Sequence, residues 1–166
     1  MDLDQAVVIA LGSNLEGRHG SSEALLEAAL ARFADVGLTV LHQSSWWRSA
    51  AWPDPLQPEY RNGVAIVETD HAPEAVLAGL LAIEAGLDRQ RGVRNAPRTL
   101  DLDLIAHGRE LRHDPGLILP HPRAHQRRFV MGPLAQIAPT WRHPVSGETA
   151  ASLARTAKIG TDASPT

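Results

Sequence analysis

The stretch that most constrains this chain is residues 98–106, which read Arg-Thr-Leu-Asp-Leu-Asp-Leu-Ile-Ala. Strict alternation of apolar and acidic residues predicts a β-strand, because successive side chains of a strand point to opposite faces of the sheet. Its three leucines would then face a core. Asp101 and Asp103 would stand about 6.6 Å apart on the other face, at roughly 3.3 Å per residue, a separation that divalent cations can bridge.

Arginines flank this strand on both sides and make its surroundings basic. Residues 89–128 hold nine of the 16 basic residues and four acids, a local charge of +5, although the whole chain has a net charge of −3. The arginines nearest to the strand in sequence are Arg89, Arg91, Arg94, Arg98, Arg123, Arg127 and Arg128. Arg binds phosphate groups in a bidentate manner, and Mg²⁺ joins phosphate oxygens to carboxylates. The segment therefore predicts a site for Mg²⁺ and a polyphosphate.

Composition and charge exclude several classes of protein. The chain has 166 residues and no cysteine, which rules out disulfides, thiolate nucleophiles and cysteine metal sites. Its net acidity argues against a general nucleic-acid binder. No apolar run approaches the roughly 20 residues that span a bilayer, and the acidic N-terminus does not resemble a signal peptide. We expect a cytoplasmic monomer that binds neither nucleic acid nor a membrane.

Hydrophobic periodicity predicts elements in the order β-α-β-β-α-β. The predicted strands are 7–11, 38–47, 63–69 and the aspartate strand, and the predicted helices are about 21–33 and 73–88. This order is typical of the ferredoxin-like fold, an α+β arrangement with a four-stranded antiparallel sheet and two helices on one face. The aspartates would lie on the other face. A short strand at 117–119 and a helical segment at 124–138, interrupted by Pro133, add a C-terminal helical extension.

The chain shows no linker or internal repeat, so residues 1–155 are predicted to form a single domain. Residues 156–166 are polar and aperiodic, and we expect a mobile tail there. The segment 49–59 contains three prolines and is predicted to be a stiff, irregular loop. Loops of this length inside compact domains are usually functional.

Several polar and aromatic residues have two interpretations that the residues alone leave open. Tyr60 and Phe129 can stack on a flat heterocycle or fill a core. Asn62 can recognise the edge of a heterocycle or end a strand. His121 can donate to a phosphate or cap a loop, and the eight histidines lack the spacing of a zinc site. A P-loop motif is absent and the only lysine, Lys158, lies in the predicted tail, which excludes a P-loop kinase.

Five blocks of the sequence occur in an order and spacing typical of one enzyme family. They are Ala10-Leu11-Gly12-Ser13-Asn14-Leu15, Gln57-Pro58-Glu59-Tyr60-x-Asn62, Ile83-Glu84, Arg94-x-Ala96-Pro97-Arg98-x-x-Asp101-Leu102-Asp103-Leu104-Ile105, and Leu119-Pro120-His121-Pro122-Arg123 running to Arg127-x-Phe129-Val130. Through them the chain resembles the 6-hydroxymethyl-7,8-dihydropterin pyrophosphokinases of folate biosynthesis. The resemblance covers residues 6 to about 153.

This resemblance implies a ferredoxin-like fold, ATP with two Mg²⁺ ions, and transfer of pyrophosphate to the pterin hydroxymethyl group with release of AMP. Asp101 and Asp103 would hold both metal ions. Positions that the family uses around ATP correspond here to Glu84, Arg89, Arg91, Arg98, Leu104, His121 and Arg127. Among these, Arg89, Arg91 and Arg98 would be the catalytic cations.

The resemblance also implies where the pterin lies. Tyr60 and Phe129 would sandwich its ring and Asn62 would bond its edge, while the backbone from Ser49 to Trp52 lines the pocket. The proline loop and the 89–97 loop would close over the site.

Two departures from the family pattern concern these loops. Residues 49–53 read Ser-Ala-Ala-Trp-Pro where many members have Thr-Pro-Pro-x-Gly, and Asn95 and Ala96 stand where many have Trp and Gly. A tryptophan that packs over the pterin in the family is therefore absent at that place, and Trp47 and Trp52 are candidates to replace it.

The expected mechanism is direct in-line attack by the pterin hydroxyl on the β-phosphorus of ATP, governed by positioning and charge neutralisation. One alternative is a Mg²⁺-dependent phosphoesterase that uses the same aspartate pair with water as nucleophile. A ferredoxin-like RNA-binding module is a third class, and the absence of its aromatic-rich strand motif argues against it.

Overall fold

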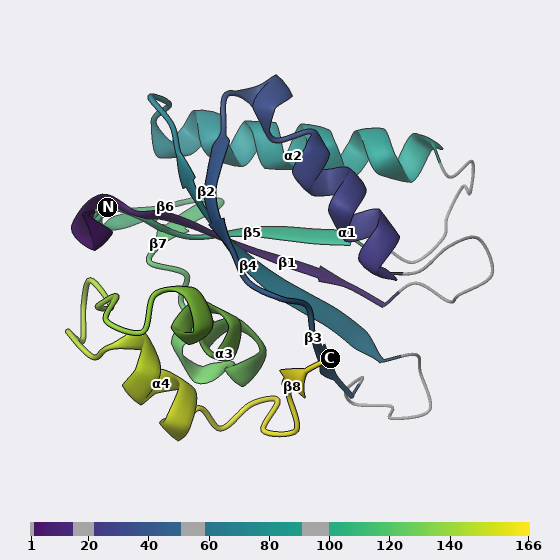
Figure 1. Ribbon diagram of the computed structural model, residues 1–166. Coiled ribbons are helices and arrows are strands. Elements are labelled where there is room, and N and C mark those ends of the chain that lie inside the picture. The colour runs from purple at the N-terminus through teal and green to yellow at the C-terminus, as the bar shows by residue number, and fades with distance from the viewer. Residues whose placement is uncertain (1, 15–21, 51–58, 91–99) are drawn as a thin grey trace.

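An antiparallel β-sheet with helices on both faces forms the body of the molecule in the computed structural model (Figure 1). The structure describes residues 2–14, 22–50, 59–90 and 100–166. Helices α1 (Ser22–Ala31) and α2 (Pro73–Gln90) cover one face, and α3 (Arg128–Ile137) and α4 (Ala150–Thr156) cover the other. Short 3₁₀ turns are η1 (Leu3–Gln5), η2 (Ala34–Val36) and η3 (Ala124–Gln126).

Within the described residues the main sheet has six strands, two more than the sequence predicted. They are β1 (Val7–Ser13), β2 (Thr39–Gln43), β3 (Trp47–Ser49), β4 (Tyr60–Glu68), β5 (Leu100–His107) and β8 (Ser164–Pro165). Their order is β5-β1-β4-β3-β8, with β2 also paired to β4, and every pairing is antiparallel. The antiparallel sheet is confirmed. The four-strand count is wrong, because the predicted strand 38–47 is split and the chain end adds β8.

The split between β2 and β3 is caused by Ser44. Its backbone N–H donates to the Val64 carbonyl, and its hydroxyl accepts from the Val64 N–H, both at 2.9 Å. The side chain thus takes the place of a strand carbonyl in the ladder. Trp46 then lies directly over Gly63, where any Cβ would collide with the indole. A hydropathy pattern cannot reveal either contact.

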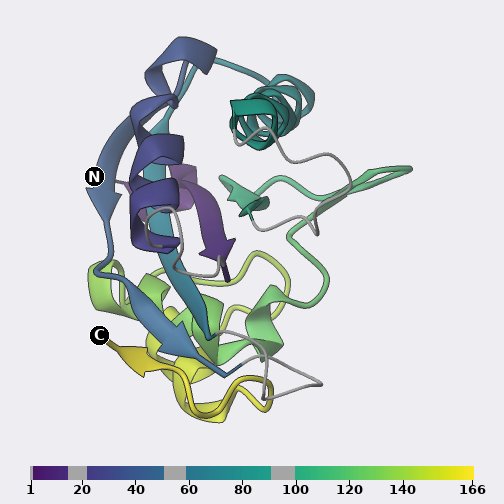
Figure 2. The ribbon, with the colours of Figure 1, turned by 90° about the vertical axis from the view of Figure 1, so that its right-hand side faces the viewer.

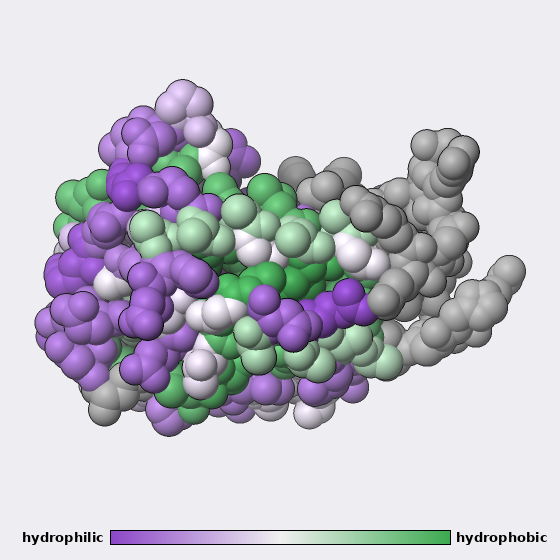
Figure 3. Space-filling view, turned by 90° about the horizontal axis from the view of Figure 1, so that it is seen from above, coloured by the Kyte–Doolittle hydropathy of each residue, from purple (hydrophilic) through white to green (hydrophobic). Residues whose placement is uncertain are grey.

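Two hydrophobic cores lie on opposite faces of the sheet. In β1, Ile9 and Leu11 enter the core under α1 and α2, whereas Val8 and Ala10 enter the core under α3 and α4. The three leucines of β5 join the first core, and its two aspartates lie on the opposite face, as the alternation predicted. The outer surface of the α1 and α2 layer is mixed: hydrophilic residues cover much of the end away from the grey segments, and a separate hydrophilic strip borders those segments (Figure 3).

A separate hairpin of β6 (Arg112–Asp114) and β7 (Leu117–Leu119) projects from this body (Figure 2). The sequence predicted β7 but not β6, because Arg-His-Asp carries no apolar alternation. Arg112 pairs with Glu74 of α2 and with Glu110 at 2.9 Å. The Glu74 pair links the hairpin to α2, whereas the Glu110 pair is local to the start of the hairpin.

The helical segment at 124–138 breaks at Arg127 and not at Pro133. Arg127 is extended, with φ −106° and ψ 111°, between η3 and α3. Pro133 lies inside α3, where it removes one intrahelical hydrogen bond. The helix continues because this side of it is buried against the sheet, and Gly132 lets the Trp47 ring approach its backbone.

Residues 157–166 are packed against the domain, whereas the sequence analysis expected a mobile tail. Ala157 and Ala163 are buried, and β8 pairs antiparallel with β3. Figure 2 shows this yellow segment running beside β3. Backbone hydrogen bonds hold it, and because such bonds leave no trace in a pattern of side chains, the polar sequence did not indicate this packing.

Candidate active site

Asp101 and Asp103 project from β5 on the face away from its leucines. Asp101 is exposed and Asp103 is partly buried. Burial raises the pKa of the Asp103 carboxyl above its ordinary value of 3.8, and the positive charge of Arg127 partly opposes that rise. A partly desolvated carboxylate with an acidic neighbour gains from a bound cation.

The donor set around these aspartates fits Mg²⁺. Among the described residues, no group of three or more His, Cys, Asp or Glu forms a closed metal site. Proteins that bind Mg²⁺ with a nucleotide commonly supply one or two carboxylates and leave the other positions to phosphate oxygens and water. The exposed carboxylate of Asp101 and the partly buried carboxylate of Asp103 match that requirement.

His121 supplies a neutral hydrogen-bond donor next to this strand. Its backbone N–H donates to the Ile105 carbonyl of β5 at 2.8 Å, and its Nδ1 accepts from the Arg123 N–H at 3.1 Å. Burial, followed by the charges of Arg127, Arg123 and His125, lowers the pKa of His121 to about 4. The ring is therefore neutral at pH 7. Because Nδ1 is an acceptor, the proton resides on Nε2, which can donate.

Arg127 connects Asp103 with the aromatic part of the site. Its charge acts on both Asp103 and His121, so residues from β5, the 119–123 turn and the start of α3 share one electrostatic environment. The Arg127 guanidinium carbon also lies 5.8 Å from the centre of the Phe129 ring, within the range of a cation–π contact. Phe129 is partly buried.

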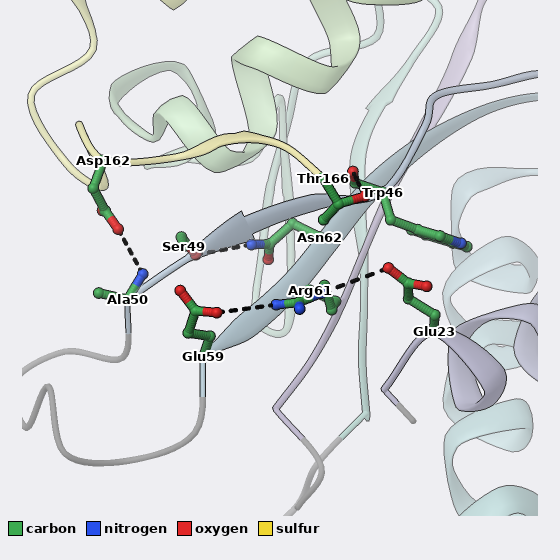
Figure 4. A network of polar contacts seen from close by, with 9 residues as sticks. All are labelled: Glu23, Trp46, Ser49, Ala50, Glu59, Arg61, Asn62, Asp162 and Thr166. Atoms are coloured by element: carbon green, nitrogen blue, oxygen red, sulfur yellow. Dashed lines mark hydrogen bonds and ion pairs between the residues drawn. The ribbon is translucent and has the colours of Figure 1, made fainter. Parts of the chain in front are cut away.

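On the other side of the site, Asn62 is held by Ser49. The Asn62 Nδ2 donates to the Ser49 Oγ at 2.9 Å, and both residues are buried (Figure 4). Tyr60 pairs with Ser49 across β3 and β4 and lies on the same face as Asn62, two residues along the strand. The sequence analysis expected Ser49 to contribute only backbone, and its hydroxyl contact was missed.

Gly12 of β1 lies between the two halves of the site. It pairs with Asn62 on one side and with Asp101 on the other. Residues directly opposite one another in a sheet point to the same face, so Asn62 and Asp101 are two strand spacings apart, about 10 Å, on one surface. A Cβ at position 12 would lie 3.2 Å from the Asn62 Oδ1. This role of Gly12 was not visible in the sequence, where it only ended a strand.

Glu84 and Leu104, both expected near ATP, are buried. The Glu84 Oε2 accepts from the Leu102 N–H at 2.7 Å and thereby attaches α2 to the aspartate strand between its two acidic residues. The Leu104 side chain lies in the first core, so contact with a nucleotide at this position would use its backbone.

Arg61, near the start of β4, forms ion pairs with two neighbouring glutamates. It forms ion pairs with Glu23 of α1 at 3.5 Å and with Glu59 at 3.6 Å (Figure 4). Both pairs are partly exposed, so their contribution to stability is small. They lie beside the strand residues that hold Asn62.

The remaining predicted site residues lie wholly or partly outside the described residues. Trp52, Arg91 and Arg98 lie outside the described residues, as do the substituted positions Asn95 and Ala96. Arg89 belongs to the last turn of α2, and its side chain is also outside the described part.

The chain matches one protein-family model, 7,8-dihydro-6-hydroxymethylpterin-pyrophosphokinase (HPPK), over residues 8–139. It is 42% identical over 147 residues to a 2-amino-4-hydroxy-6-hydroxymethyldihydropteridine pyrophosphokinase of Synechocystis sp., covering 88% of this chain and 73% of the relative. An enzyme of the same name from Pseudomonas aeruginosa is 40% identical over 146 residues, covering 84% of this chain and 85% of the relative.

Solved structures show the same fold. The HPPK-DHPS of Plasmodium falciparum crystallised with pteroate has a TM-score of 0.70 and 12% identity, and the match covers 90% of this chain and 44% of that one. The chain thus spans less than half of that protein. In the described part of the chain, no helix is both long and apolar enough to cross a bilayer.

Proposed function

The chain belongs to the 7,8-dihydro-6-hydroxymethylpterin-pyrophosphokinase family, and from this membership we propose how its own residues carry out pyrophosphate transfer from ATP to 6-hydroxymethyl-7,8-dihydropterin. The observation that carries the proposal is the register around Gly12. It aligns Asn62, an amide suited to a heterocycle edge, with Asp101, a carboxylate suited to Mg²⁺, on one surface. The hydroxymethyl group and the phosphates then meet between them.

Asp101 and Asp103 hold Mg²⁺ in this proposal. Together with the polyphosphate, the two carboxylates provide oxygen ligands for two ions. When bound, the metal neutralises phosphate charge and orients the reacting phosphorus. The raised pKa of Asp103 supports the assignment, because a bound cation would offset the unfavourable burial of its charge.

The pterin lies against Asn62, Tyr60 and Phe129. Ser49 engages one N–H of the Asn62 amide, which fixes the orientation of the carbonyl oxygen and leaves the second N–H for the heterocycle. The aromatic rings of Tyr60 and Phe129 supply flat surfaces for stacking. The backbone near Ser49 and Trp52 completes the pocket.

Arg127 and His121 bind the nucleotide phosphates. Arg127 contributes a full charge and His121 a neutral Nε2–H donor, which suits a crowded cationic site because it adds no further charge. Additional catalytic cations come from Arg89, Arg91 and Arg98. The nucleotide also lies near Glu84 and Leu104, which act on it through the backbone of β5.

The pterin hydroxyl attacks the β-phosphorus in line, without a covalent enzyme intermediate. The bond from the β-phosphorus to the oxygen that bridges the α- and β-phosphates breaks, AMP departs with that oxygen, and the hydroxyl proton is released to solvent. His121 is an unsuitable general base, since its acceptor nitrogen is already engaged by the Arg123 N–H. Alignment of the reactants therefore supplies much of the rate enhancement, and this effect can be worth about 7–11 kcal/mol.

The strand order β5-β1-β4 followed by β2 and β3 supports the ferredoxin-like arrangement, extended here by β8. We place a single domain at 1–155, against which 157–166 pack, and we expect a cytoplasmic monomer.

Incubation of the protein with ATP, Mg²⁺ and the reduced pterin, followed by mass spectrometry, tests this function. AMP and pterin diphosphate should appear in equal amounts, only when the pterin is present, and EDTA should abolish both. AMP with free pyrophosphate in the absence of pterin would instead indicate the phosphoesterase, an alternative that the relatives do not support.

A further inference from the structure

The C-terminal segment, residues 159–166, contacts both walls of the proposed pterin site. At its beginning, the Ile159 N–H donates to the Gln126 carbonyl at 3.0 Å, and the Ile159 carbonyl accepts from the Arg128 N–H at 2.9 Å. These two bonds hold the backbone on either side of Arg127, at the point where α3 begins.

Gly160 lies against Phe129, the next residue of that wall. Its φ of +68° is in the left-handed region, and a Cβ placed on it would be 2.5 Å from the Phe129 Cδ1. Only glycine satisfies both conditions without strain or displacement. The backbone of Gly160 therefore packs against the Phe129 ring and limits how far that ring can move toward the segment.

The end of the segment contacts the opposite wall at β3 (Figure 4). The Asp162 Oδ2 accepts from the Ala50 N–H at 2.7 Å, directly after Ser49, which holds Asn62. β8 extends this attachment along β3, and the Thr166 N–H and hydroxyl both donate to the Trp46 carbonyl at 3.0 Å.

We propose that residues 159–166 set the distance between the two pterin-binding walls, with Gly160 and Asp162 as positioning residues for Phe129 and for Ser49 with Asn62. The inference rests on the proposed function. The two walls, at 46–50 and 126–129, are far apart in sequence, and in the described part of the chain they are also joined through the sheet and through α3, whose Gln136 accepts from the Ser45 N–H at 3.0 Å and from the Trp47 Nε1–H at 3.3 Å. The segment adds a direct connection at the residues next to the predicted pterin contacts.

Gly160→Ala tests the first contact, and Gly147→Ala is its matched control. Gly147 has a similar φ of +73°, but a Cβ there meets nothing within 4 Å. Both variants place a side chain at a similar positive φ, and only Gly160→Ala displaces Phe129. We expect the pterin dissociation constant, measured by calorimetry with a non-hydrolysable ATP analogue and Mg²⁺ present, to rise about tenfold or more in Gly160→Ala. The ATP-analogue constant should change by less than about twofold.

Asp162→Ala and Asp162→Asn test the second contact. The asparagine keeps a carbonyl oxygen that can accept from the Ala50 N–H, so it should rescue the alanine variant. We expect the KM for pterin to rise about fivefold in Asp162→Ala at unchanged kcat, and to return to near the wild-type value in Asp162→Asn.

The proposal is overturned if Gly160→Ala binds pterin as tightly as Gly147→Ala, or if Gly160→Ala weakens pterin and ATP equally. An Asp162→Asn variant as impaired as Asp162→Ala would also contradict it. Thermal unfolding identifies any variant that fails to fold. If one glycine or aspartate variant does not fold, the variants of the other residue test the proposal. If the wild type itself forms no pterin diphosphate, the proposed function fails. If the wild type is active but the variants match their controls, only this inference fails.

Discussion

Asn62 and Asp101 are paired with the same residue, Gly12, from opposite sides of β1. Their side chains consequently share one face of the sheet at about twice the strand spacing. This relationship places a recognition group for the acceptor and a metal ligand for the donor within reach of a single bound pair of substrates.

Replacing Asn62 should separate pterin binding from ATP binding. Asn62→Ala removes the amide that faces the pterin edge, and each hydrogen bond lost at a buried site costs about 1–3 kcal/mol, or roughly 5- to 150-fold in affinity. Ser49→Ala keeps the Asn62 amide but removes the hydrogen bond that orients it, so the loss of pterin affinity should be smaller. Calorimetry with each ligand measures the difference, and an equal loss of ATP affinity in Asn62→Ala would argue against the assigned pocket.

Asp103→Asn should lose most of its activity and yet be more stable than the wild type at pH 7. Burial raises the pKa of this carboxyl, so its charged form is less favourable in the folded protein than in the unfolded chain, and removal of the charge relieves that cost. The difference in stability should shrink as the pH falls through the raised pKa, where the wild type becomes neutral as well.

The loss of activity in Asp103→Asn should reach about 10³-fold, because metal coordination at phosphate is worth several kcal/mol. Asp114→Asn, in the exposed β6–β7 hairpin, is the control and should keep wild-type turnover. A stable Asp103→Asn variant that still turns over at the wild-type rate would remove this residue from the metal site.

Tyr60 provides a test of stacking. Aromatic pairs contribute about 0.5–1.5 kcal/mol beyond the area they bury, so Tyr60→Ala should weaken pterin binding about tenfold while Tyr60→Phe, which keeps the ring, should bind nearly as the wild type does. Should both variants lose the same affinity, the hydroxyl rather than the ring would be responsible.

His121 gives a pH dependence with a defined sign. Its pKa in the folded protein, about 4, is below the ordinary 6.5, so the unfolded chain binds the proton more tightly between these values. Stability from this group is complete above pH 6.5 and is lost as the pH falls toward 4. As the pH falls, urea unfolding should therefore show a larger loss of unfolding free energy for the wild type than for His121→Gln. Parallel curves of unfolding free energy against pH would contradict the neutral ring.

The aspartate strand could be predicted because apolar and acidic side chains alternate from Leu100 to Leu104, and the burial of its leucines confirms that prediction. Two other features could not be predicted: the split at Ser44 and the packing of residues 157–166. The first depends on the Ser44 hydroxyl bonding to Val64 and the second on backbone hydrogen bonds to the chain end, and both involve partners distant in sequence. The relationship of Asn62 to Asp101 depends on the register of three strands, which no local pattern determines. The family resemblance supplied residue roles that physical patterns alone left open.

A crystal structure of the protein with Mg²⁺, a non-hydrolysable ATP analogue and the pterin tests the central claim most directly. The account predicts Mg²⁺ within about 2.1 Å of carboxylate oxygens of both Asp101 and Asp103, the pterin edge on Asn62, and its hydroxymethyl oxygen about 3–3.5 Å from the β-phosphorus. Aspartate oxygens without metal, or a pterin bound away from Asn62, would contradict it.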